Sequence, residues 1–393
     1  MSELAYLTSA SSTTSSFERH TLQTLRRLSL VILGFAAGVT HCTPLLAQHP
    51  QPTPAVLRTK VVENLPKWLK QYNVPSVSVA YIANGKLVWT AVAGEQSPGV
   101  PANDKTLYNI ASLTKPIVAE TILRMASQGK LQLDEPIYPY WVDPDVKDNP
   151  WNKLLTPRLC LSHQTGFANW RRMTNNVLTF NFQPGTQSHY SGEGYFYAAR
   201  FAQNKMQEPF DQLVQQYVLG PLGMKDTSFT TQDWFSGRLA KPYGKNGFME
   251  PQLTSTWNAA DLVHTTVTDY ARFVISVMNK EALSPDIAAQ RLAITRDWVP
   301  DDGRKQVCAH EPPGTACHLS AGMGLGWQII VHNGVMIVDH SGSDDGAHTY
   351  AFFVPAKHLG AVIFTNGENG PKVIGEIVRI LYPDPVYGET VSH

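Results

Sequence analysis

Residues 76–95 read SVSVAYIANGKLVWTAVAGE, and this stretch decides the fold class that the sequence predicts. Two runs rich in β-branched and aromatic residues flank Asn84-Gly85, and Asn-Gly between such runs is the strongest short signal for a β-hairpin. We therefore expect strands at about 76–83 and 86–93, joined by a tight turn. Strands joined in this way pair antiparallel.

The other end of the chain carries a second hairpin of the same kind. Residues 324–340, GLGWQIIVHNGVMIVDH, turn at Asn333-Gly334. Two further strand-like runs follow, HTYAFFVP at 348–355 and LGAVIFTN at 359–366. Strand signals are therefore concentrated at the two ends of the chain.

Helical patterns border both groups of strands, at 61–72 and 372–382, and the long middle segment is mostly helical with Pro, Gly and Asn-rich loops. The economical fold is of the α/β (α+β) class. One antiparallel sheet is built from both chain ends and flanked by the terminal helices, with a mostly helical region inserted. The expected domain, 59–385, divides into a sheet region at about 59–110 and 320–385 and a helical region at about 111–319.

The N-terminus is typical of an export signal. Arg26 and Arg27 precede the apolar run LSLVILGFAAGV at 28–39, which is shorter than the ~20 residues that a spanning helix needs. We expect a signal peptide at 1–47, a Pro-rich linker at 48–58, and an exported bacterial protein that is periplasmic or secreted. No stable membrane span is expected after cleavage, although an uncleaved anchor is the alternative.

The charge balance disfavours polyanionic partners. Lys and Arg together number 32, as do Asp and Glu, so the formal net charge is zero. Nothing in this balance favours nucleic acid or an anionic membrane surface as the main partner.

Two cysteines bracket a loop rich in turn residues. Cys308 and Cys317 flank AHEPPGTA, and in an exported protein we expect a disulfide that pins this loop. His310 and His318 lie beside them, so a zinc site is the alternative. The spacing matches no standard zinc pattern, and we expect no metal and no cofactor.

The chemistry of the sequence centres on ASLTK, residues 111–115. Ser112 and Lys115 stand three positions apart, and on a helix such residues share a face. A serine hydroxyl becomes a good nucleophile when a base removes its proton, and a buried lysine with a lowered pKa can be that base. The alternative is that Ser112 merely caps a helix whose first turn contains Pro116.

Two further groups accompany this pair. Tyr190 follows a Pro-Gly turn, and His340-Ser341-Gly342 ends a strand. In this order and rough spacing, the chain resembles the serine hydrolases that include class C β-lactamases, D,D-peptidases and related family VIII-type esterases. Similar segments extend the resemblance over almost all of the chain after the signal: LCLSHQTGF (159–167), PLGMKDTSF (221–229) and GMGLGW (322–327).

The resemblance implies a β-lactamase/transpeptidase-like fold and a role for each group. Ser112 would be the acylated nucleophile and Lys115 its partner base. Tyr190 would share a proton with that lysine and later activate the hydrolytic water. His340 would lie on the strand that edges the cleft, near Tyr190 and the substrate.

The resemblance also implies the surroundings of the substrate. The backbone N–H of Ser343 would complete an oxyanion hole with that of Ser112. Ser341, Gly342 and Gly192 would line the substrate site. The substrate would be a small molecule or a fragment derived from peptidoglycan.

Two departures from the family pattern bear on function. Gly192 stands where the family usually has the Asn of Tyr-x-Asn, and His340 stands where β-lactamases proper carry the Lys of Lys-Thr-Gly. We therefore expect an esterase or D,D-peptidase-like serine hydrolase rather than an efficient β-lactamase, with an ester, a D-amino-acid peptide or a β-lactam as substrate. The alternative is a penicillin- or peptidoglycan-binding protein of the same fold that does not turn its ligand over.

Overall fold

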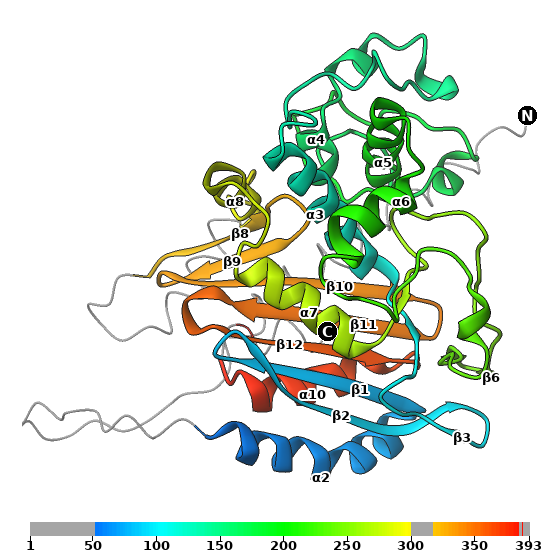
Figure 1. Cartoon of the computed structure of the whole chain (residues 1–393), viewed down its shortest axis with the longest axis vertical. Helices are drawn as coiled ribbons and strands as arrows, with labels where there is room; N and C mark the ends of the chain where they lie inside the picture. The colour runs from blue at the N-terminus through cyan, green and yellow to red at the C-terminus, as the bar shows by residue number, and fades with distance from the viewer. Residues whose placement is uncertain (1–51, 300–316, 385–386, 388–393) are drawn as a thin grey trace, which may run out of the picture.

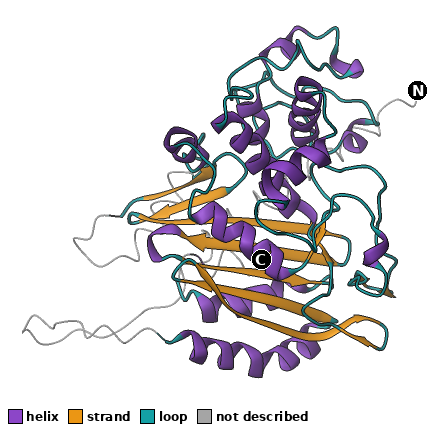
Figure 2. Cartoon of the chain, viewed as in Figure 1, coloured by secondary structure: helices purple, strands orange, loops and turns teal. Residues whose placement is uncertain are grey.

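The computed structural model describes residues 52–299, 317–384 and 387 (Figures 1 and 2). One eight-stranded sheet joins the two ends of the chain, in the order β3-β2-β1-β12-β11-β10-β9-β8. Its strands pair antiparallel, and the N-terminal β1 lies directly beside the C-terminal β12, with Ser78 opposite Phe364. The predicted fold class is confirmed, because both ends build the sheet and a largely helical region lies between them in sequence.

The sheet comprises β1 (Ser76–Ala83), β2 (Lys86–Ser97), β3 (Val100–Pro101), β8 (Leu319–Met323), β9 (Gln328–His332), β10 (Val335–Asp344), β11 (Ala347–Val354) and β12 (Leu359–Thr365). Two short ladders pair β4 (Tyr108–Asn109) with β7 (His264–Thr265) and β5 (Tyr243–Gly244) with β6 (Gly247–Phe248). The described α-helices are α2 (Pro54–Tyr72), α3 (Thr114–Ser127), α4 (Pro157–Leu161), α5 (Gly192–Met206), α6 (Phe210–Val214), α7 (Val267–Met278), α8 (Pro285–Arg291) and α10 (Gly370–Leu381).

Both predicted hairpins form, with the turns where the sequence indicates them. Asn84 and Gly85 have φ values of 52° and 68°, and Asn333 and Gly334 have values of 48° and 80°. Two consecutive residues with positive φ are what a two-residue turn between twisted antiparallel strands requires, and Asn and Gly tolerate that region best. The first hairpin is longer than expected on one side, because β2 continues to Ser97.

Helix α2 begins earlier than the sequence pattern indicates. Thr53 caps it by accepting a hydrogen bond from the backbone N–H of Val56, and Pro54 occupies the first turn. Residues 54–58 are therefore helical, although we expected them to belong to the linker. Pro66 lies inside the helix, which nevertheless continues to Tyr72.

The two faces of the sheet bury different sets of side chains, because successive residues of a strand point to opposite faces. In β11, Ala351 and Phe353 belong to the core shared with α3, α5 and α7, whereas Phe352 and Val354 belong to the core under α2 and α10. Figure 1 shows α7 crossing the first face and the remaining helical region standing above it. This arrangement places the helical region against β10, the strand that carries the predicted histidine.

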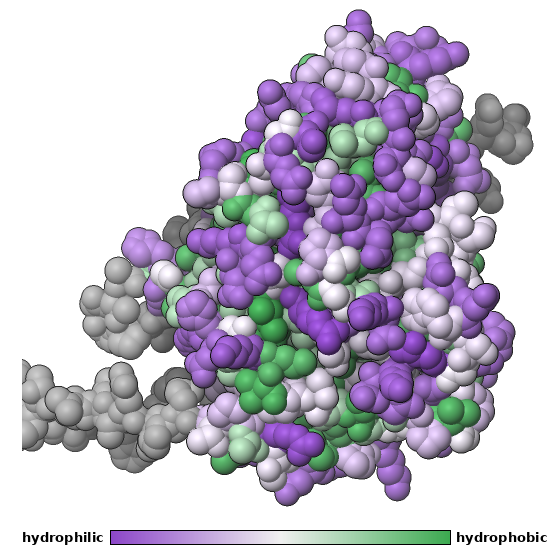
Figure 3. Space-filling view, in the orientation of Figure 1, coloured by the Kyte–Doolittle hydropathy of each residue, from purple (hydrophilic) through white to green (hydrophobic). Residues whose placement is uncertain are grey.

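The surface of the two regions differs on the face seen in Figure 3. Hydrophilic residues predominate over the helical region, and hydrophobic residues gather mainly over the sheet. Among the described residues, no helix combines the length and the apolar character needed to cross a membrane. The predicted signal peptide, residues 1–47, lies outside the described residues.

Candidate active site

Ser112 lies in a short helical turn, η1 (Ala111–Leu113), directly before α3. The turn starts with strained backbone, since Ala111 has a φ of 47°, a left-handed value that costs a non-glycine residue energy. The side chain of Asn109 stabilises this conformation by accepting a hydrogen bond from Ala111 N at 2.9 Å. Ser112 is not the N-cap of α3, because Leu113 occupies that position and no side chain caps the helix.

Lys115 and Ser112 are in direct contact. Lys115 Nζ donates to Ser112 Oγ at 2.9 Å and to the carbonyl oxygen of Ala260 at the same distance. Lys115 is fully buried, and three rings surround its amine, with centroids at 4.8 Å for Tyr190, 5.7 Å for Trp170 and 5.9 Å for Tyr195. The sequence expectation that the pair shares one face is therefore met in the geometry.

The surroundings of Lys115 favour its neutral form. Burial lowers its pKa from 10.5 to about 7, and the carboxylate of Asp261 opposes this change. At neutral pH a large fraction of the amine is therefore unprotonated. An amine in this state, hydrogen-bonded to a serine hydroxyl, can accept the hydroxyl proton.

Tyr190 lies next to the same pair. Its hydroxyl is hydrogen-bonded to the side chain of Ser112, and burial raises the pKa of Tyr190 above its ordinary value despite that bond. Its ring stacks on His163 with centroids 4.3 Å apart. His163 is itself fixed, because its Nδ1 accepts from the backbone N–H of Ser191 at 3.0 Å. The phenol is thus held protonated beside the nucleophile.

His340 lies on β10, with its ring centroid 6.2 Å from that of Tyr190. Its Nδ1 is 2.7 Å from the carbonyl oxygen of Ser341, and because a carbonyl only accepts, Nδ1 must carry the proton. Burial, with a smaller effect of Lys115, lowers the pKa of His340 to about 3. The imidazole is therefore neutral at physiological pH.

Strand β10 packs closely on the turn that carries the nucleophile. A side chain at Gly342 would place its Cβ 2.2 Å from the carbonyl oxygen of Ile110, so only glycine permits this approach. Thr349 of β11 donates to the same carbonyl at 2.9 Å. Ser341 is half-buried here and Ser343 is exposed. Gly342, which the sequence placed beside the substrate, thus has a packing reason of its own.

Gly192 begins α5, and the structure explains why it is glycine. Its N–H donates to the side chain of Asn169 at 2.9 Å, and Ser191 caps the helix through Gly194 N. A Cβ at Gly192 would lie 3.2 Å from both Trp170 and Ala260. The asparagine that the family usually carries here would therefore displace its neighbours, and Trp170 packs against the space beside Gly192.

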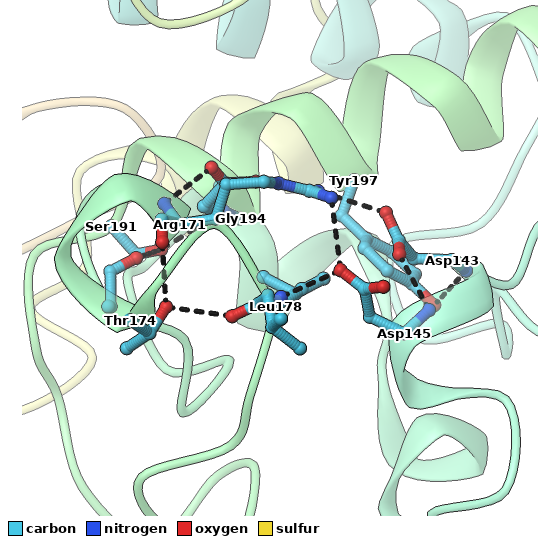
Figure 4. A network of polar contacts seen from close by, with 11 residues as sticks. Asp143, Asp145, Arg171, Thr174, Leu178, Ser191, Gly194 and Tyr197 are labelled. Atoms are coloured by element: carbon cyan, nitrogen blue, oxygen red, sulfur yellow. Dashed lines mark hydrogen bonds and ion pairs between the residues drawn. The ribbon is translucent and has the colours of Figure 1, made fainter.

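A polar network fixes the loop that carries Trp170 (Figure 4). Arg171 forms ion pairs with Glu193 and Asp143, each at 2.9 Å, and a longer one with Asp145 at 3.4 Å. Asp145 in turn accepts from the backbone N–H of Leu178 at 2.8 Å. The network borders a cavity of about 430 Å³ whose aromatic walls are Trp141, Phe196 and Tyr197. It joins α5, the 143–145 turn and the Trp170 loop into one unit.

Sequence reasoning missed Trp170 and Asp261. Both lie in loops without periodic pattern, and neither belongs to a motif, so no local signal distinguishes them. His163 lay inside the SHQTG segment, but nothing in its spacing indicated that it would stack on Tyr190. These three residues reach the site through tertiary packing.

The predicted disulfide lies partly outside the described residues. Cys317 is disulfide-bonded. Cys308 lies outside the described residues, as does His310 of the alternative zinc site. The pairing of Cys308 with Cys317 therefore stays a prediction. Cys160 is a free, buried thiol. Within the described ranges, no group of three or more His, Cys, Asp or Glu side chains could hold a metal ion.

Comparisons with known proteins agree with the fold and show the family of the chain. A family model described as beta-lactamase matches residues 58–381. A beta-lactamase of Pseudomonas fluorescens is 25% identical over 340 residues, covering 79% of this chain and 93% of that protein. The D-alanyl-D-alanine-carboxypeptidase/endopeptidase AmpH of Escherichia coli strain K12 is 25% identical over 295 residues, covering 69% and 74%. The structure of D-alanine carboxypeptidase AmpC from Burkholderia cenocepacia is similar in fold, with a TM-score of 0.65 and 23% identity over 84% of this chain and 98% of that chain.

Proposed function

The chain belongs to the beta-lactamase family and is a serine hydrolase of that family; on this premise we propose that it acts through an acyl-enzyme on Ser112. The observation that carries the proposal is the 2.9 Å contact between Lys115 Nζ and Ser112 Oγ, made by an amine without solvent exposure. The substrate is an ester, a D-amino-acid peptide or a β-lactam. The names of the relatives, a beta-lactamase and a D-alanyl-D-alanine-carboxypeptidase, support this range.

The acylation step uses the three buried groups together. Lys115 takes the hydroxyl proton while Ser112 Oγ bonds to the substrate carbonyl carbon, and the carbonyl becomes an oxyanion. The backbone N–H groups of Ser112 and Ser343 hold that oxyanion. The proton then passes from Lys115 through the phenol of Tyr190 to the leaving group, whose bond to carbon breaks as the carbonyl re-forms. Since Tyr190 is protonated, it serves as a relay and not as a permanent phenolate base.

Deacylation repeats these transfers with water. Lys115, with Tyr190, accepts a proton from the attacking water, and the ester bond to Ser112 Oγ breaks after a second oxyanion forms. Ser112 Oγ regains a proton and the acid product leaves. His340 stays neutral throughout and contributes a hydrogen-bond acceptor, because its Nδ1 carries the proton.

Side-by-side turnover tests this function. p-Nitrophenyl esters, nitrocefin and a D-Ala-D-Ala peptide are incubated with the wild-type protein, Ser112→Ala and Lys115→Met. We expect hydrolysis of at least one substrate class and a loss of about 10³-fold or more in both variants. Ser127→Ala is the matched control, since Ser127 and Lys130 form a second S-x-x-K. Undiminished turnover in Ser112→Ala would reject the proposal.

A binding protein without turnover is the second candidate. The residue that favours it is Gly192, which lacks the amide that the family usually presents to the substrate. A fluorescent penicillin, chased over time, separates the two functions. Release of the hydrolysed label indicates turnover, whereas a permanent adduct on Ser112 indicates a binder.

We also propose that the protein is exported. Arg26 and Arg27 before the apolar run at 28–39 support a cleaved signal, and the cysteine pair Cys308 and Cys317 suits an oxidising compartment. N-terminal sequencing of the protein recovered from periplasm or medium would locate the cleavage site, which we expect near residue 47.

A further inference from the structure

We propose that this site narrows the substrate range given above: through the carboxylates of Asp261 and Asp344 it disfavours substrates with a carboxylate near the scissile carbonyl, as in β-lactams and D-Ala-D-Ala peptides, and prefers esters with neutral or, above all, positively charged acyl groups. The inference rests on the proposed function, since it assigns the substrate class of the same nucleophile.

Asp261 is held beside the reactive lysine. It follows Ala260, whose carbonyl oxygen accepts from Lys115 Nζ at 2.9 Å. The segment is rigid, since Ala260 N donates to Asn258 Oδ1 at 2.9 Å and Leu262 N donates to Asp261 Oδ1 at 2.7 Å. Leu262 has a φ of 66°, a strained value that the surrounding contacts must maintain. The charge of Asp261 acts on both Lys115 and Tyr190.

Asp344 approaches the site from the sheet, whereas Asp261 lies in a loop of the helical region. It ends β10, the strand of His340, and its Oδ2 accepts from Asn109 Nδ2 at 3.0 Å. The same Asn109 holds the strained Ala111 next to the nucleophile through its Oδ1, at 2.9 Å. Asp261 and Asp344 are also close enough to interact, because the charge of Asp344 contributes, after burial, to raising the pKa of Asp261 to about 6. Asp261 therefore acts on Lys115 and Tyr190 directly, whereas Asp344 acts on Asp261 and contacts the Asn109 side chain that supports the turn of the nucleophile.

Few cations compensate these two carboxylates. Neither forms an ion pair with any residue in the described part of the chain. Arg172 is exposed, lies 5.1 Å from the centroid of Trp170, and lowers the pKa of Asp261 only as a minor effect. Lys115, whose pKa is about 7, carries only part of a positive charge near pH 7. The local field at neutral pH is therefore negative.

His340 strengthens this conclusion. It occupies the position where β-lactamases proper carry a lysine, yet it is uncharged because burial lowers its pKa to about 3. With the proton on Nδ1, Nε2 is an acceptor, and this buried atom has no hydrogen-bond partner. A substrate with a hydrogen-bond donor, such as an ammonium or an amide N–H, can donate to the unpaired Nε2 and is attracted by the two carboxylates. A substrate carboxylate can donate to none of these groups and is repelled by both carboxylates.

Three esters with one leaving group test the charge preference. The p-nitrophenyl esters of 4-(trimethylammonio)butyrate and of 5,5-dimethylhexanoate are isosteric and differ by one positive charge, and the glutarate monoester is the anionic member. Its enzyme-free rate is subtracted. We expect kcat/KM to be roughly five- to tenfold higher for the cationic than for the neutral ester, and lower by a similar factor for the anionic ester. Raising the ionic strength should reduce both ratios.

Substitutions at the two carboxylates localise the effect. Asp261→Asn keeps the oxygen that accepts from Leu262 N, so the turn is preserved while its charge is lost. We expect the cationic-to-neutral ratio to fall at least threefold in Asp261→Asn and to approach one when Asp344→Asn is added. Glu63→Gln, an exposed residue of α2 on the other face of the sheet, should leave the ratio unchanged. Ratios are compared because Asp261 also acts on Lys115, which affects all three esters alike.

The outcomes distinguish a failure of the charge preference from a failure of the proposed function. If Ser112→Ala abolishes turnover of all three esters but the wild-type protein ranks them independently of charge, the charge preference is wrong and the nucleophile stands. A wild-type ratio that survives the double substitution would also overturn the preference. If Ser112→Ala leaves turnover intact, the proposed function itself is wrong.

Discussion

The amine of Lys115 lies 5.7 Å from the centre of the Trp170 indole, and the same indole occupies the space into which a side chain at Gly192 would point. One aromatic side chain thus shields the amine and takes up room in which the family usually places an asparagine. This relationship connects the most notable departure of the sequence with the lowered basicity of the lysine. It also makes the departure testable.

Trp170→Ala should raise the kinetic pKa of Lys115. The amine must be neutral to accept a proton, so kcat/KM rises with pH through its pKa, which is about 7 in the native protein. Removing the indole admits water and favours the charged amine. The rising limb of the pH profile of kcat/KM should therefore move to higher pH by roughly one unit. The pH dependence of kcat/KM measures the shift. Trp170→Phe is the control that retains an aromatic ring, and an unshifted limb in Trp170→Ala would contradict the shielding role.

Arg171 should influence the same limb from a distance. It braces the Trp170 loop through Glu193 and Asp143 (Figure 4). We expect Arg171→Gln to shift the limb in the direction of Trp170→Ala but by less, and to lower the melting temperature. Arg171→Lys keeps the charge but loses the forked geometry, so its shift should be intermediate. A lower melting temperature with an unshifted limb would leave Arg171 with a structural role alone.

A side chain at Gly192 should destabilise the protein. Because a Cβ would lie 3.0 Å from Asn169 O and 3.2 Å from Trp170, Gly192→Ala should lower the free energy of unfolding by about 1–3 kcal/mol. Urea denaturation of both proteins measures the loss. Adding Trp170→Ala should recover part of it, since the indole is one of the contacts. A Gly192→Ala protein as stable as wild type would show that the packing is looser than described.

Asp339 should make stability fall as pH rises. Burial raises its pKa from 3.8 to about 7, while hydrogen bonds from Tyr350 and Tyr387 oppose the change. The folded protein therefore binds this proton more tightly than the unfolded chain, and the resulting stabilisation, complete below pH 4, is lost as pH rises to about 7. Relative to wild type, Asp339→Asn should gain roughly 1–3 kcal/mol between pH 4 and pH 8. Parallel urea titrations at both pH values measure it, and a constant difference would be the contrary result.

The sequence predicted the parts of this protein that depend on local interactions. Asn84-Gly85 and Asn333-Gly334 fix their turns through backbone preference, and these turns fix the pairing of neighbouring strands. The spacing of Ser112 and Lys115 likewise determines their contact. These features require few partners distant in sequence.

The remaining features depend on tertiary contacts that no local pattern carries. In the sequence, Gly192 is notable only because it replaces the asparagine that the family usually carries. The packing of Trp170 and Ala260 against it shows why glycine is needed. In the sequence, His340 stands where β-lactamases proper carry a lysine. Its burial in the structure lowers its pKa and keeps it neutral. Asp261 belongs to no motif, so its position beside Lys115 follows from the folded chain alone.

The central claim is that Ser112 is the acylated nucleophile, and peptide mapping after fluorophosphonate labelling tests it most directly. The account predicts one adduct, on the tryptic peptide that contains Ser112, which is absent in Ser112→Ala and retained in Ser127→Ala. It also predicts that labelling slows below pH 7 as Lys115 becomes protonated. An adduct on another residue, or one that persists in Ser112→Ala, would contradict the account.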